Sequence, residues 1–115
     1  MVKKISNFQG ESALLEYAKN NADKQALKTA VRFTLQKIAD RYPGRSVEIR
    51  IPPYGATQIL SGTTHRRGTP PAVVETDPVT WIQLCTGKID WEHAVLSNKV
   101  EANGQRSDIG HIFPL

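Results

Sequence analysis

The sequence predicts an α+β domain in which a small, mostly antiparallel sheet has helices packed on one face. Two changes of pattern along the chain lead to this fold class. Apolar residues recur at helical spacing in the first part, and the period changes to two from Arg45 onward. Helix signals return in the last third, after the strands. A chain of 115 residues is expected to form one domain over 1–115, with residues 1–22 as a candidate peripheral N-terminal helix.

The first part of the chain predicts two helices, over residues 11–20 and 24–41. Asp23 is a suitable cap for the second helix, and Pro43 with Gly44 ends it. Its basic residues are interleaved with acids and amides and accompany no helix-turn-helix or zinc-finger pattern, so we expect a solvated face and no stable nucleic-acid binding. The apolar sides comprise Ala13, Leu14, Tyr17 and Ala18 in the first helix and Leu27, Ala30, Val31, Thr34, Leu35 and Ile38 in the second; the basic residues are Lys24, Lys28, Arg32 and Lys37.

The middle of the chain predicts three strands. Val47, Ile49 and Ile51 alternate with polar residues, which is typical of a half-buried strand. The stretch 46–60 then forms a hairpin around a Pro-Pro-Tyr-Gly turn, and 72–76 is a third strand. Because the strands follow one another along the chain, we expect an antiparallel meander.

The last third predicts two short helices, a strand and a final helix. Asp77 caps the first of these helices and Gly87 ends it, while Asp90 caps the second. Asn98 tolerates a left-handed conformation and ends the second helix. The remaining elements are a strand over 99–102 and a short helix over 107–113 capped by Ser107.

Composition and residue spacing argue against catalysis and against a metal or cofactor. Cys85 is the one cysteine, so neither an internal disulfide nor an all-cysteine metal site can form. It follows Leu84 one turn after Trp81, which predicts a core position. The apolar runs are too short for a membrane span, and no apolar segment follows the basic N-terminus, so a cytoplasmic protein is expected. The histidines, which have no metal-binding spacing, are His65, His93 and His111.

One loop is the clearest candidate for binding an anion. Arg66 and Arg67 offer guanidinium groups suited to a carboxylate or phosphate, and His65 precedes them. Gly68 and two following prolines shape a stiff segment, which would lose less entropy on binding. Arg50 joins this site if the hairpin brings it near. The alternative is a solvated surface loop that only leads into the next strand.

Several motifs of the chain resemble those of sterol carrier protein domains. The last third matches the family pattern at Trp81, Gly87-Lys88, Ala94, Lys99-Val100 and Gly104, with Asn98 where the family usually has Gly. The segments from Arg50 to Ala56 and from His65 to Pro78 are similar to those of small bacterial sterol-carrier-like proteins.

The resemblance implies a non-enzymatic protein that binds a lipid, a fatty acyl chain or acyl-coenzyme A in a cavity between helices and sheet. A carboxylate or phosphate headgroup would then meet the basic loop. The alternative is a scaffold or interaction module without a ligand, like the accessory sterol-carrier-like domains of thiol-dependent enzymes. The oligomeric state is left open. The candidate cavity-wall residues, of which Trp81 and Trp91 could equally be core residues, are Val47, Ile49, Ile51, Ile59, Val74, Trp81, Leu84 and Trp91.

Overall fold

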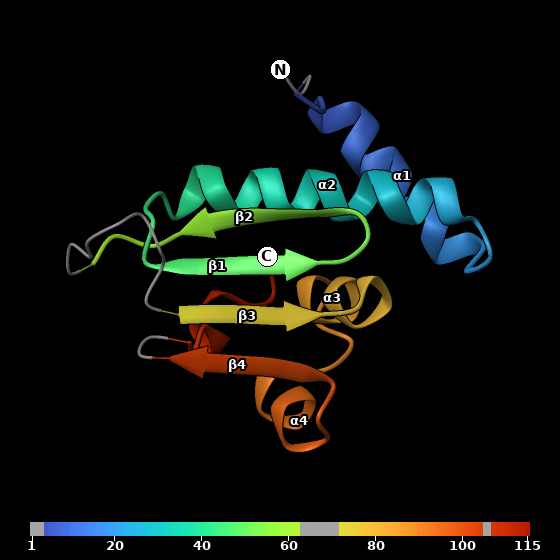
Figure 1. Ribbon diagram of the computed structural model, residues 1–115. Helices are drawn as coiled ribbons and strands as arrows, with labels where there is room; N and C mark the ends of the chain where they lie inside the picture. The colour runs from blue at the N-terminus through green and yellow to red at the C-terminus, as the bar shows by residue number, and fades with distance from the viewer. Residues whose placement is uncertain (1–3, 63–71, 105–106) are drawn as a thin grey trace.

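A computed structural model of the chain describes residues 4–62, 72–104 and 107–115. Helices α1 and α2 come first, the strands follow, and two short helices precede the last strand (Figure 1). This order confirms the predicted α+β class. The elements are α1 (Asn7–Lys19), α2 (Lys24–Arg41), β1 (Val47–Ile51), β2 (Gly55–Ile59), β3 (Ala72–Thr76), α3 (Pro78–Cys85), α4 (Trp91–Leu96), β4 (Val100–Gly104) and a single 3-10 turn, η1 (Gly110–Ile112).

The four described strands form one mixed sheet in the order β2-β1-β3-β4. β1 and β2 make the predicted antiparallel hairpin, and β3 and β4 are also antiparallel, but β3 runs parallel to β1. The expected meander is therefore wrong at this step. Both edges of a hairpin can accept the next strand, and β1 is the better central strand. Its inward residues are all apolar, whereas β2 presents Gly55 and Thr57 at the same positions.

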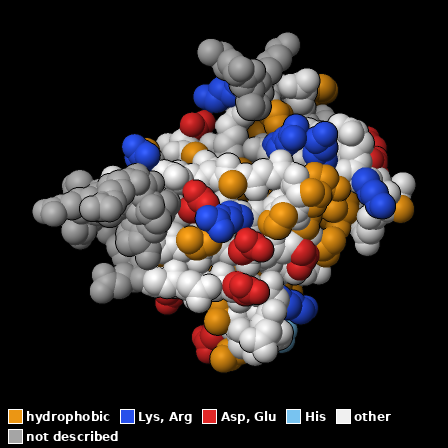
Figure 2. All heavy atoms as spheres, viewed as in Figure 1, with side chains coloured by type: hydrophobic (Ala, Val, Ile, Leu, Met, Phe, Trp, Pro, Cys, Tyr) orange, Lys and Arg blue, Asp and Glu red, His pale blue; other side chains and the backbone are white. Residues whose placement is uncertain are grey.

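The sheet has one covered face and one open face. Alternate residues such as Ile49 in β1 and Val74 in β3 are buried on the face that α2 and α3 cover, and these two helices lie behind the strands in Figure 1. The other face carries charged side chains of both signs, among them Glu48 and Arg50, and Figure 2 views the molecule from this side. Helices on one face of a small sheet are the predicted architecture.

The predicted caps of the central and later helices are confirmed. Asp23, Asp77 and Asp90 each accept a backbone N–H bond three residues further on, at 2.7–3.0 Å. Asn98 has φ 58°, the left-handed conformation predicted for it.

Two helix predictions at the ends of the chain are wrong. The first helix begins at Asn7 instead of residue 11, because Ser6 and Gln9 form a capping box. The predicted helix over 107–113 is only the turn η1, and Ser107 does not cap it. Gly110 packs against the Trp91 ring, where an added Cβ would lie 2.7 Å from the nearest ring atom, and this contact fixes the turn in place.

The helices form two layers over the sheet. α2 lies directly on the strands, and α1 crosses it on the outside (Figure 1). Gly10 makes this crossing close, because a Cβ there would come within 2.1 Å of the Phe33 ring. α3 reaches α2 through Trp81, whose Nε1 donates a hydrogen bond to Thr34 Oγ1 at 2.8 Å. Within the ranges that the structure describes, no helix is long and apolar enough to cross a membrane.

Candidate functional site

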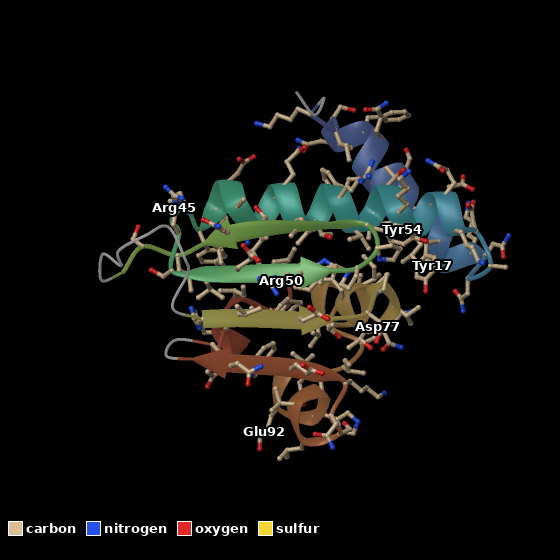
Figure 3. All side chains as sticks on the ribbon, viewed as in Figure 1. Tyr17, Arg45, Arg50, Tyr54, Asp77 and Glu92 are labelled. Atoms are coloured by element: carbon tan, nitrogen blue, oxygen red, sulfur yellow. The ribbon has the colours of Figure 1, made fainter. Side chains whose placement is uncertain are left out.

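An open groove of about 520 Å³ lies where α2, the start of β2 and the N-terminal segment meet. Leu35 is its buried floor, and Tyr54 stands at the turn between β1 and β2 (Figure 3). This volume falls within the range of about 300–1,000 Å³ typical of small-molecule sites. The groove is therefore large enough for part of an apolar chain. Its lining consists of Ile5, Arg32, Leu35, Gln36, Tyr54, Gly55, Ala56 and Thr57.

Side chains of α2 hold both walls of the groove. The Gln36 amide joins the backbone of Ile5 by two hydrogen bonds, accepting from its N–H at 2.9 Å and donating to its carbonyl oxygen at 2.8 Å. On the opposite wall, Arg32 Nε donates to the Tyr54 carbonyl oxygen at 3.0 Å. The absence of a side chain at Gly55 keeps that wall close to Leu35, since a Cβ would lie 3.3 Å from Leu35 Cδ1. Hydrogen bonds from α2 side chains therefore hold both walls of the groove in place.

A second, smaller hollow of about 250 Å³ adjoins the groove between α1 and the first half of α2. Ile5 and Arg32 line both hollows, so the two meet there. The other residues that line the smaller hollow are all of polar type, namely Gln9, Gln25, Lys28 and Thr29.

The predicted cavity-wall residues lie elsewhere. All except Trp91 are buried in the packed core, and none of the eight lines the groove or the smaller hollow. Trp91 is half-buried, stacks on Phe113 at 5.9 Å, and lines a separate hollow of about 650 Å³ with Asp90 and His111. A role of these residues in ligand binding stays a prediction, and the core residues are Val47, Ile49, Ile51, Ile59, Val74, Trp81 and Leu84.

The predicted anion site is described only at Arg50. His65, Arg66 and Arg67 lie outside the described residues, so their proposed role stays a prediction. Arg50 projects from the open face of the sheet (Figure 3), where its Nε donates to the Glu48 carboxylate. This hydrogen bond lowers the pKa of Glu48. An anion at Arg50 would therefore have to compete with Glu48.

Cys85 occupies the core position predicted for it. It is 4% exposed, and burial raises the pKa of its thiol, although the hydrogen bond with Thr34 and the charge of Lys37 act in the opposite direction. A buried neutral thiol is a poor nucleophile. Among the described residues no group of three His, Cys, Asp or Glu side chains is placed to hold a metal ion.

Sequence reasoning missed the groove but contained one signal of it. Lys28 and Arg32 are one turn apart on α2, and Leu35 and Gln36 continue the same stripe. The stripe changes from basic to apolar along the helix, whereas the sequence pattern assigns Lys28 and Arg32 to a solvated face and Leu35 to the apolar side. The partners Ile5 and Tyr54 are distant in sequence, and no local pattern links them to the helix.

The described chain is thus an α+β domain with helices on one face of its sheet and a partly apolar groove beside its main helix. Residues 23–115 match the family model described as bacterial SCP ortholog, and the chain belongs to this sterol-carrier-like family. The match confirms the resemblance inferred from the sequence. It begins at the end of the α1–α2 connection, so α1 precedes it. No curated protein matches the chain.

Proposed function

We propose that this protein binds a lipid, a fatty acyl chain or the acyl part of acyl-coenzyme A, without converting it, between α2 and the edge strand β2. The observation that carries the proposal is the groove of about 520 Å³ floored by Leu35. Membership of the sterol-carrier-like family supports a hydrophobic ligand.

Apolar burial would supply most of the affinity. Each Å² of apolar surface removed from water contributes about 25 cal/mol before the costs of association are subtracted. The groove provides such surface at Ile5, Leu35 and Tyr54. Its hydrogen bonds are already made within the protein, so a ligand tail need not displace them.

One observation favours the alternative of a scaffold or interaction module without a ligand. The seven core residues predicted as cavity walls are at most 1% exposed and pack against one another. A lipid enclosed between α2 and the middle of the sheet would have to displace them. The proposal therefore places the ligand in the open groove, at the edge of the sheet.

A displacement assay with paired variants tests the proposal. A fluorescent fatty acid should bind saturably and be displaced by unlabelled fatty acid. Thr57→Trp, which puts a large ring on a groove-lining position of β2, should weaken binding about tenfold or more by occluding the groove. Gln58→Trp is the control, because Gln58 is in the same strand but does not line the groove.

The controls decide between the two functions. Both variants must first show wild-type thermal unfolding. If the wild type shows no saturable binding, the protein is better explained as a scaffold or interaction module without a ligand. Equal affinities of Thr57→Trp and Gln58→Trp would mean that the ligand lies outside the groove.

A further inference from the structure

The stripe of α2 that lines both hollows changes in polarity along its length. Gln25, Lys28 and Thr29 line the smaller hollow, and Leu35 and Gln36 line the groove. Arg32 stands between them and lines both. At a rise of about 1.5 Å per residue, Lys28 and Leu35 are about 10 Å apart along the helix axis. An amphiphile with one polar and one apolar end would match this order.

The smaller hollow has the chemistry of an anion site. Its described lining contains two cations and no carboxylate, together with the neutral polar side chains of Gln9, Gln25 and Thr29. Lys28 is partly buried, and neither it nor Arg32 takes part in the ion pairs found among the described residues. Two cations one helical turn apart repel each other, so an anion between them would relieve that repulsion.

The orientation of Arg32 supports the same conclusion. Its Nε is used in the hydrogen bond to the Tyr54 carbonyl oxygen. This bond anchors the planar guanidinium at the junction of the two hollows and leaves its Nη groups for another acceptor. Arginine suits carboxylate and phosphate because its donors have a fixed fork geometry.

We propose that the smaller hollow receives the anionic head of an amphiphile, a carboxylate or a phosphate, while the tail lies in the groove. The proposal rests on the proposed function and narrows its ligand class to anionic amphiphiles. Lys28 and Arg32 bind the head, and Gln9, Gln25 and Thr29 add neutral hydrogen-bonding groups. This site uses other residues than the anion site predicted from the sequence at Arg66 and Arg67.

The test compares a fatty acid, an alkyl phosphate and a fatty alcohol of one chain length, each displacing the fluorescent probe. Lys28→Gln should weaken the acid and the phosphate about tenfold or more, because a hydrogen bond to a charged group is lost, and the alcohol less than about twofold. Lys24→Gln is the matched control. It removes the same charge one helical turn from Lys28, and Lys24 does not line the hollow. Inorganic phosphate alone should not displace the probe at millimolar concentration, because it lacks a tail.

Each contrary outcome overturns a different claim. A wild type that binds none of the three ligands overturns the proposed function itself. A wild type that binds the alcohol as tightly as the acid, or equal losses in Lys28→Gln and Lys24→Gln, overturns the head-group site only. Displacement by inorganic phosphate alone would show a site for a small anion and not for an amphiphile. A selective loss of acid binding in Arg66→Gln/Arg67→Gln, with Lys28→Gln unaffected, would place the head at that loop instead.

Discussion

The two long sides of α2 differ in how completely they are packed. The side toward the sheet and α3 is closed, with Val31 and Ile38 fully buried and the Thr34 hydroxyl hydrogen-bonded to Trp81. Within the described residues no buried side-chain nitrogen or oxygen lacks a partner. The stripe through Lys28, Arg32 and Gln36 is instead covered only in part, and both hollows open there.

This difference shows which side of α2 leaves open space beside it. A lipid pocket and a core are built from the same apolar residue types, and only the packing distinguishes them. Here the most apolar side of the helix is the filled one. The hollow lies where the apolar side of α2 meets its polar face, next to an edge strand with small residues.

The largest expected effect tests the closed side. Trp81→Ala should lower the free energy of unfolding by about 3–5 kcal/mol, because it leaves a cavity in a filled core and removes the partner of Thr34. Urea denaturation measures this change. A loss below about 1 kcal/mol, in the range of ordinary surface substitutions, would mean that the region around Trp81 is already hollow.

A smaller effect is expected where α1 crosses α2. Gly10→Ala should destabilise the protein by about 1–3 kcal/mol through overpacking against Phe33, although alanine is the better helix former. Phe33→Leu removes the ring that causes the conflict. In that background, Gly10→Ala should cost much less, and thermal unfolding of the four variants measures the coupling. Additive effects would contradict the close contact.

The smallest effect concerns the wall of the groove. Gln36→Ala removes both hydrogen bonds to Ile5, each of which contributes about 0.5–1.5 kcal/mol. The free energy of global unfolding should change only a little, because this contact is at the partly exposed N-terminal end, which can open locally. The Ile5 amide should instead exchange its hydrogen much faster, as hydrogen-exchange NMR can measure. Gln25→Ala is the control, because the hydrogen bonds found for the Ile5 backbone among the described residues do not involve Gln25. Unchanged exchange at Ile5 would show that the wall does not depend on Gln36.

Local signals predicted most of the secondary structure. Asp23, Asp77 and Asp90 each have a carboxylate that accepts a hydrogen bond from a backbone N–H three residues on. Such helix caps can be predicted from the sequence because they depend only on residues a few positions apart. The start of α1 was missed although Ser6 and Gln9 have the spacing of a capping box. The parallel pairing of β1 and β3 was not predictable in the same way, since both edges of the hairpin were available.

The groove was not predictable because its walls come from distant parts of the chain. Ile5 and Gln36 are 31 residues apart, and Arg32 and Tyr54 are 22 apart. The sequence did indicate the alternation of Val47, Ile49 and Ile51, but an alternating pattern shows only that these residues face inward. Whether the space they face is filled depends on the exact shapes of side chains from α2 and α3.

The hydrogen bond between Trp81 and Thr34 requires that α2 be rotated about its own axis so that Thr34 faces α3. An α-helix turns by about 100° per residue. A shift of one residue would carry Lys28 into the place of Leu27 and Arg32 into that of Val31, both now buried against the core. The Thr34 hydroxyl also donates toward the carbonyl oxygens of Ala30 and Val31, and these contacts fix the orientation of the Thr34 side chain on the helix. This hydrogen bond and the buried apolar side of α2 therefore favour the same rotation of the helix, the one that leaves Lys28 and Arg32 at the two open hollows.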